Sequence, residues 1–176
     1  GTAARPGHAL RAGDQIRYLP DPRPEPRVAR SYRILHEDDS ILAVHKPAHL
    51  PVHPSGRYYR NTLLMMLLAD RNEQLDDASL RIVHRLDRET SGVILFGKQR
   101  EAATALAMQF EHRQVRKGYL AIVHGRPGED RFLIDAPIGR DPASIVRKAM
   151  TVTPEGLRAR TSVKVLRRGP EHTLLL

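Results

Sequence analysis

The 176-residue chain contains no cysteine and no tryptophan, and only 5% of its residues are aromatic. The lack of cysteine excludes disulfide bonds, thiolate zinc fingers and thiol catalysis. It also suits a cytoplasmic protein, which is the location we expect. The few aromatic residues argue against a base-stacking platform of the RRM type. No apolar run approaches the ~20 residues needed to cross a bilayer, so we expect no membrane partner.

Positive charge is what the chain has in excess. Lysine and arginine number 29 against 20 aspartate and glutamate residues, which gives a formal net charge of +9 and an isoelectric point near 10.4. Most of the basic residues are arginine, whose planar guanidinium binds phosphate well. This balance favours a polyanionic partner, and nucleic acid is the first candidate. A soluble basic protein without such a partner is the alternative.

The order of segments predicts one main domain behind a short N-terminal piece. Residues 1–19 end in a turn at Gly13-Asp14 that leads into a short strand. Proline occupies every second position from Pro20 to Pro26, which forbids a helix and favours an extended linker over residues 20–31. The main domain then covers residues 32–176.

The hydrophobic pattern of the main domain predicts two short helices among many strands. One helix is capped by Asn61 and runs over residues 63–68, and the other covers residues 101–112. The expected strands are residues 41–44, 82–83, 93–96, 118–124, 131–135, 148–152 and 157–166. Because no regular βαβ alternation occurs, we expect an α+β fold with a mixed, largely antiparallel sheet flanked by short helices.

The most informative segment is the polar loop HRLDRETSG at residues 84–92, which lies between two apolar stretches. A short loop between strands can aim one reactive side chain, and Asp87 is the candidate catalytic carboxylate. A structural role is equally open at this point. In that role Asp87 caps Thr90 or Ser91 and pairs with Arg85 or Arg88.

Three competing motifs fail on residue type or spacing. Gly92 and Gly97-Lys98 have the spacing of a phosphate-binding loop, but the required Ser or Thr is missing and the residues between them form a buried strand. HRLD at residues 84–87 is faintly similar to the catalytic loop of protein kinases. The chain lacks a downstream Asn at the required spacing, a kinase Gly-rich loop and an Asp-Phe-Gly triplet. His49 and His53 have the spacing of a helical metal pair, but neighbouring prolines rule out a helix, so we expect no metal.

Together the motifs resemble those of the RluA-type pseudouridine synthases. The loop at residues 84–92 is similar to that family's signature around its essential Asp. Further matches follow in the same order within residues 32–176, namely residues 39–47 and His53, residues 117–125, 138–141 and 147–150, and then Gly156 and residues 159–161. The N-terminal residues resemble the end of an S4-like RNA-binding module, which often precedes this catalytic domain.

The resemblance implies the pseudouridine synthase fold and an RNA-modifying isomerase. The uracil of a uridine is detached from its ribose, rotated and rejoined through carbon, without metal, cofactor or energy input. Asp87 is then the catalytic carboxylate, Tyr119 packs on the uracil and assists proton removal from C5, and Arg85 orients Asp87. The expected RNA-binding residues are His84, Arg88, Thr90, Lys46, His53, Arg140 and Lys148.

The resemblance also implies the partner. We expect a monomer that acts on large-subunit ribosomal RNA, since an S4 remnant and linker are common in members acting there, with transfer RNA as the second choice. The alternative is a non-catalytic RNA-binding or ribosome-assembly protein on the same fold. A metal-dependent hydrolase that uses Asp38 and Asp39 is a distant third.

The chain stops on Leu174-Leu175-Leu176, an apolar run that we expect to belong to a strand of a longer protein. The family's third motif, which supplies a basic residue paired with the catalytic Asp, is expected just beyond it. An Asp buried without that partner would favour its neutral form. We therefore expect this segment alone to be inactive and the natural protein to be an enzyme.

Overall fold

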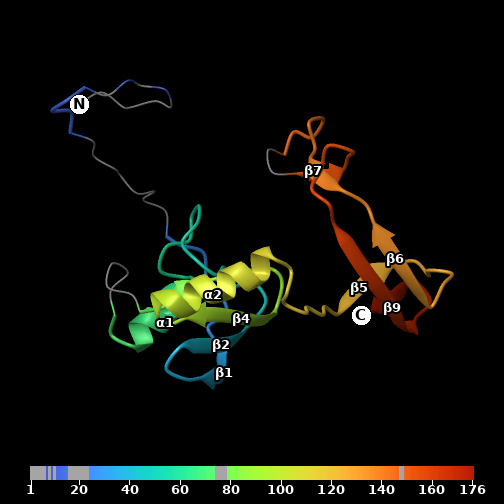
Figure 1. Cartoon of the computed structure of the whole chain (residues 1–176), viewed down its shortest axis with the longest axis horizontal. Helices are drawn as coiled ribbons and strands as arrows, with labels where there is room; N and C mark the ends of the chain where they lie inside the picture. The colour runs from blue at the N-terminus through green and yellow to red at the C-terminus, as the bar shows by residue number, and fades with distance from the viewer. Residues whose placement is uncertain (1–6, 8, 10, 16–23, 74–78, 147–148) are drawn as a thin grey trace. The chain divides into compact units, whose positions relative to one another are not determined.

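The computed structural model describes residues 7, 9, 11–15, 24–73, 79–146 and 149–176 (Figure 1). It divides into two compact units, Gly1–Val115 and Arg116–Leu176. All strand pairs are antiparallel among the described residues, which confirms the expected α+β class. None of the described helices is long and apolar enough to span a membrane.

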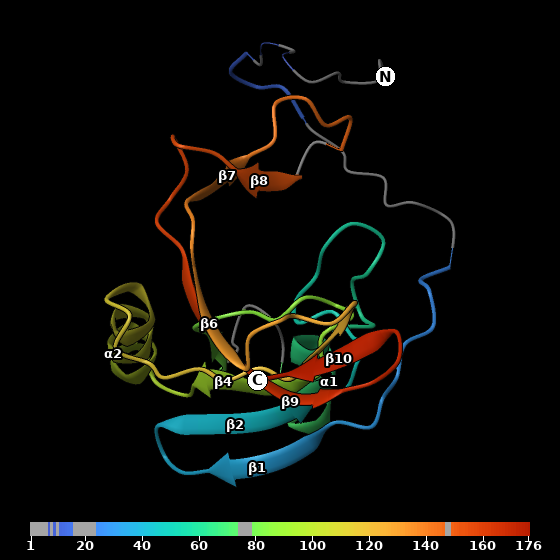
Figure 2. The same ribbon diagram turned by 90° about the vertical axis from the view of Figure 1, so that its right-hand side faces the viewer.

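The first unit is built on a four-stranded sheet with the order β1-β2-β4-β3. Its strands are β1 (Arg33–Glu37), β2 (Ile41–Lys46), β3 (Arg81–Ile82) and β4 (Gly92–Gly97). Figures 1 and 2 show β1, β2 and β4 side by side. The register pairs Lys46 with Gly92, so the end of β2 lies beside the start of β4. The 84–92 loop enters the sheet at this same place.

Two helices accompany this sheet, α1 (Leu63–Asp70) and α2 (Arg100–Glu111). Both were expected from the sequence, but the predicted cap of α1 was wrong by one residue. Thr62 is the N-cap, and its hydroxyl accepts a hydrogen bond from the Met65 N–H at 3.3 Å. The Asn61 amide instead donates to the Pro26 carbonyl at 2.9 Å, so a tertiary contact outcompetes the local cap.

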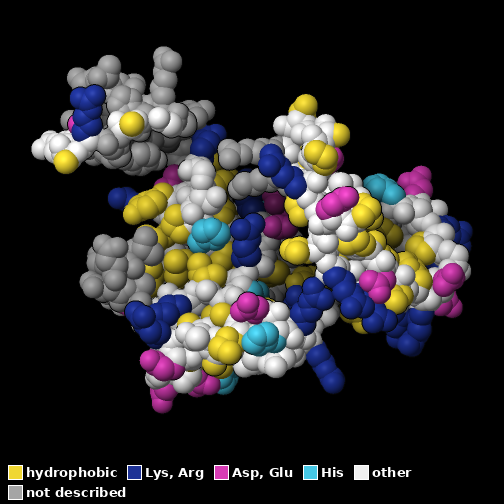
Figure 3. All heavy atoms as spheres, turned by 45° about the horizontal axis from the view of Figure 1, so that its top comes forward, with side chains coloured by type: hydrophobic (Ala, Val, Ile, Leu, Met, Phe, Trp, Pro, Cys, Tyr) yellow, Lys and Arg dark blue, Asp and Glu magenta, His cyan; other side chains and the backbone are white. Residues whose placement is uncertain are grey.

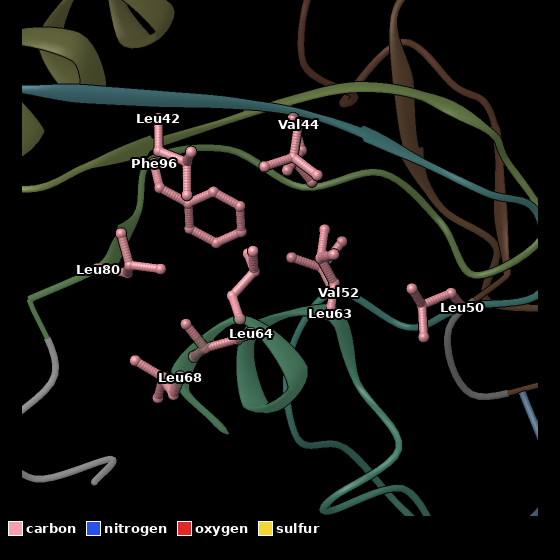
Figure 4. Close-up of a cluster of buried hydrophobic side chains, with 11 residues drawn as sticks. Leu42, Val44, Leu50, Val52, Leu63, Leu64, Leu68, Leu80 and Phe96 are labelled. Carbon is pink, nitrogen blue, oxygen red and sulfur yellow. The ribbon is translucent and has the colours of Figure 1, made fainter. Parts of the chain in front are cut away.

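The core of the first unit lies between the sheet and α1 (Figure 4). Leu42 and Val44 of β2 and Ile94 and Phe96 of β4 point to one face, because strand side chains alternate with a period of two. They meet the leucines of α1, and each such side chain contributes about 1.5–3 kcal/mol when fully buried. Lys46 continues the same alternation two residues beyond Val44 and is therefore carried inside with them.

Gly97 closes β4 directly against α2. A Cβ added at this position would lie 2.5 Å from the Cα and 2.6 Å from the Cβ of Ala103, a buried residue of the helix. We expect Gly97→Ala to lower the free energy of unfolding by about 2–3 kcal/mol, because the helix backbone has to move away. Gly128→Ala is the matched control, since its Cβ would meet nothing within 4 Å. Equal losses in urea denaturation of the two variants would contradict this close packing.

The second unit holds a separate four-stranded sheet with the order β5-β10-β9-β6 and a two-stranded ribbon, β7-β8. The strands are β5 (Ala121–His124), β6 (Arg131–Asp135), β7 (Ile138–Arg140), β8 (Met150–Val152), β9 (Arg160–Arg168) and β10 (His172–Leu175). Leu157 was expected to start the ninth strand but lies outside it. Its backbone N–H and C=O both pair with Ile138 at 2.9 Å, which makes a bridge to the ribbon instead.

The predicted turn near the N-terminus is confirmed. Asp14 closes it by donating its N–H to the Arg11 carbonyl at 3.1 Å, and Gly13 has φ +95°. The short strand expected after this turn lies outside the described residues.

Glu25, in the proline-rich segment, is anchored to the first unit. Its carboxylate accepts hydrogen bonds from the backbone N–H of Arg60 at 2.9 Å and of Asn61 at 2.8 Å. Burial, the largest single influence, raises the pKa of Glu25, but the backbone hydrogen bonds together bring this pKa below its ordinary value. These hydrogen bonds therefore fix the proline-rich segment at Glu25 to the backbone just before α1.

This anchor predicts a pH-dependent contribution to stability. Because the folded-state pKa of Glu25 lies below the unfolded value, the contribution is complete at neutral pH and is lost as the pH falls through the folded-state pKa. We expect Glu25→Gln to lower the free energy of unfolding by about 1 kcal/mol at pH 7, and by less at pH 3. Glu129→Gln, at an exposed position, is the control. An equal difference at both pH values would refute the assignment.

Candidate active site

Asp87 begins a tight turn between β3 and β4. The Thr90 N–H donates to the Asp87 carbonyl at 3.1 Å, which closes the turn over Arg88 and Glu89. Gly92 then enters β4 with φ +141°, a conformation that favours glycine, and Leu86 anchors the loop against the core. The loop is thus fixed at both ends, while the Asp87 side chain is exposed.

Lys46 supports this turn from inside the protein. Its ammonium is fully buried and donates to the carbonyls of Leu50 at 2.8 Å, Pro47 at 3.0 Å and Arg88 at 3.2 Å. Burial lowers the pKa of Lys46, whereas the carboxylates of Glu89 and Asp87 raise it. Lys46 was expected to contact RNA, but in this structure its ammonium serves the chain's own carbonyls.

His84 ties the start of the loop to two other elements. Its Nε2 accepts the Leu95 N–H of β4 at 3.0 Å, which extends the hydrogen bonding of β3 after that strand has ended. Its ring also stacks on Phe110 of α2, with 4.4 Å between ring centroids and 23° between planes. His84 was expected to contact RNA, and these contacts give it in addition a clear part in shaping the loop.

Arg88 is held by two neighbours on the surface. Its Nη1 donates to the Tyr58 hydroxyl at 2.7 Å, and its Nε donates to the Glu89 carboxylate at 2.6 Å. The guanidinium carbon also lies 5.6 Å from the centroid of the Tyr58 ring. The hydrogen bond from Arg88 lowers the pKa of Glu89. Sequence reasoning did not identify Tyr58, because nothing local marks a contact across 30 residues.

These contacts can be compared with the structural role left open for Asp87. Within the described part of the chain, the Asp87 carboxylate has no hydrogen-bond or ion-pair partner, and Arg88 pairs with Glu89. Only the main-chain carbonyl of Asp87 takes part in the turn. The Asp87 side chain is exposed in this structure. An exposed carboxylate on a turn that is fixed at both ends is suited to chemistry.

The remaining predicted site residues are distributed over both units. Arg85 is exposed in the same loop, Thr90 is half-buried at its end, and His53 is half-buried after the core residue Val52. Tyr119 precedes β5 in the second unit and is 54% exposed.

In the same second unit, Arg140 ends β7 and is exposed, whereas Lys148 lies outside the described residues.

The metal-site and phosphate-loop motifs can both be compared with the described residues. No three His, Asp or Glu side chains within them gather into a group that could hold a metal ion. Gly92–Gly97 is strand β4, as expected when the phosphate-loop reading was rejected. The carboxylate at Asp87 is therefore the site's most distinctive chemical group.

Comparisons with known proteins show which family the chain resembles. A family model described as RNA pseudouridylate synthase matches residues 40–176. Ribosomal large subunit pseudouridine synthase D of Nitrosomonas europaea is 41% identical over 81% of this chain and 41% of its own length. The uncharacterized RNA pseudouridine synthase YlyB of Bacillus subtilis is 35% identical over 99% of this chain and 59% of its own length.

A solved structure agrees as well. Human RNA pseudouridylate synthase domain containing 4 superposes with a TM-score of 0.63 at 28% identity, covering 81% of this chain and 56% of that chain. The chain thus spans about half the length of the relatives it matches. Because the family model matches residues 40–176 and a relative is 35% identical over 99% of the chain, the chain belongs to the RNA pseudouridine synthase family.

Proposed function

We propose that the protein isomerises uridine to pseudouridine in RNA, with Asp87 as its catalytic carboxylate. The observation that carries this proposal is the exposed Asp87 side chain on a turn that Lys46, His84 and Leu86 hold in place. Family membership supplies the reaction class. A carboxylate can serve as a nucleophile or as a base.

The reaction requires one bond to break and one to form at the same ribose carbon. The bond from C1′ to uracil N1 breaks, the uracil rotates, and a bond from C1′ to C5 replaces it, while C5 loses its proton and N1 gains one. Asp87 attacks the ribose or the base, or removes a ribose proton, during the first step. Tyr119 packs on the uracil and assists proton removal from C5. Arg85, exposed in the same loop, orients Asp87 and contacts the RNA.

The proposed substrate is large-subunit ribosomal RNA, and the proposed location is the cytoplasm. The relative that is 41% identical is named as a ribosomal large subunit enzyme. A net charge of +9 suits a polyanion, and Lys and Arg side chains are spread over the face drawn in Figure 3. Transfer RNA is the second substrate to be tested. The target uridine has to leave its stack, and arginine contacts to phosphates offset that cost of a few kcal/mol.

The decisive experiment measures tritium release from RNA labelled at uracil C5, using the full-length natural protein. We expect release from large-subunit ribosomal RNA that is insensitive to EDTA. Release from transfer RNA alone would redirect the substrate assignment. RNA binding without any release would favour the non-catalytic RNA-binding alternative, and loss of release in EDTA would favour a metal-dependent reaction.

A further inference from the structure

A tight turn adjoins the Asp87 loop in the first unit. Ser55 and Tyr58 exchange two backbone hydrogen bonds, Ser55 N–H to the Tyr58 carbonyl at 2.9 Å and Tyr58 N–H to the Ser55 carbonyl at 3.0 Å. Gly56 has φ +59°, which places it in the left-handed region that such two-residue turns require. We call residues 55–58 the tyrosine turn. Its paired hydrogen bonds give it a fixed geometry.

Arg88 links the tyrosine turn to the turn that carries Asp87. The Tyr58 hydroxyl accepts one N–H of the guanidinium at 2.7 Å, and the Tyr58 ring lies beside the guanidinium carbon at 5.6 Å. The Glu89 carboxylate oxygen lies 2.6 Å from Nε and 2.5 Å from Nη2 of the same guanidinium. A guanidinium has five N–H donors, and these contacts use three of them. The plane of Arg88 is therefore set while donors are left for an anion.

The segment that follows the tyrosine turn is also anchored. Glu25 accepts the backbone N–H groups of Arg60 and Asn61, immediately before α1. On either side of Tyr58, Arg57 and Tyr59 are exposed, and Tyr59 is 55% exposed. Cations interleaved with an exposed aromatic ring are suited to single-stranded RNA, whose phosphates pair with arginine and whose bases stack on rings.

We propose that Tyr58 is a positioning residue, which holds Arg88 so that its guanidinium contacts a phosphate of the RNA strand beside the target uridine. The inference rests on the proposed function and assigns a substrate contact to its site. Tyr58 is an uncharged partner, so it orients the cation without neutralising it. The Arg88–Glu89 pair is exposed, and exposed ion pairs are weak enough for a phosphate to share the guanidinium.

The test is a double-mutant cycle in the full-length protein. Tyr58→Phe removes the hydroxyl and keeps the ring, and Arg88→Gln removes the cation. Thr104→Val, on α2, is the control that loses an exposed hydroxyl. Binding of the labelled RNA is measured against salt, together with KM and kcat for tritium release. Thermal unfolding of each variant verifies that it is folded.

Arg88→Gln should reduce the slope of log K against log salt by about 0.7–0.9, the loss of one phosphate contact. Tyr58→Phe should raise KM about three- to tenfold with kcat within about twofold, because it loosens one contact made to the bound RNA. Thr104→Val should change neither constant. In the Arg88→Gln background, Tyr58→Phe should have no further effect, since Tyr58 acts through Arg88.

Two outcomes would overturn the inference, namely a salt slope unchanged by Arg88→Gln, or an undiminished effect of Tyr58→Phe when Arg88 is already Gln. Either result with normal tritium release would remove the inference and leave the proposed function intact. If tritium release were absent but the coupling of Tyr58 and Arg88 in RNA binding were preserved, the proposed function would be rejected and the role of Tyr58 would stand.

Discussion

Asp87→Asn should reduce tritium release from the labelled RNA by at least about 10³-fold while RNA binding stays within about twofold. Asn has nearly the same shape as Asp but is neither a nucleophile nor a base at neutral pH. The substitution should cost the fold little, because the Asp87 carboxylate accepts no hydrogen bond from a described group and acts on the buried Lys46 only through its charge. Loss of turnover without loss of binding would therefore report on chemistry alone.

Asp39→Asn provides the matched control for this variant. Asp39 is also exposed and lies in the first unit, at the turn before β2. It should retain wild-type release, and a loss there together with sensitivity to EDTA would revive a metal-dependent reaction. Equal release from Asp87→Asn and the wild-type protein would reject Asp87 as the catalytic carboxylate, whatever the RNA.

Lys46→Met should lower the free energy of unfolding by about 2–5 kcal/mol and abolish tritium release in whatever fraction remains folded. Met fills a similar volume, so the change isolates the ammonium. Three carbonyls, those of Pro47, Leu50 and Arg88, then lose a donor in or near the interior. Because the Arg88 carbonyl belongs to the turn that Asp87 begins, the turn should loosen as the protein weakens.

Lys117→Met is the control for Lys46, since Lys117 is exposed. Its free energy of unfolding should change by less than about 0.5 kcal/mol. Chemical denaturation of both variants measures the difference, and hydrogen exchange at Thr90 N–H reports on the turn directly. A Lys46→Met protein as stable as the control would show that the buried ammonium contributes nothing net, its desolvation cancelling its hydrogen bonds.

Much of the fold was predictable from the sequence because the spacing of apolar residues specifies most of its helices and strands. The leucines at helical spacing in residues 63–68 gave α1, and the alternation in residues 41–44 and 93–96 gave the two central strands. The weakest predictions lay at boundaries, where a tertiary contact competes with a local one. Asn61 lost its capping role to Thr62 once its amide bonded Pro26, and Leu157 left its expected strand by pairing with Ile138.

The site divides in the same way. The sequence by itself determined the order of the motifs around Asp87. It also predicted Asp87 as the catalytic carboxylate and a polyanion as the partner, because these predictions depend on residue type and spacing along the chain. Only the tertiary structure decided that Lys46 is buried under the turn, that His84 stacks on Phe110 and that Tyr58 grips Arg88. The pairing register of β2 and β4 sets the position of Lys46, and the packing of α2 sets the stacking of His84 on Phe110. Contacts between distant segments such as these produce no periodic pattern in the sequence.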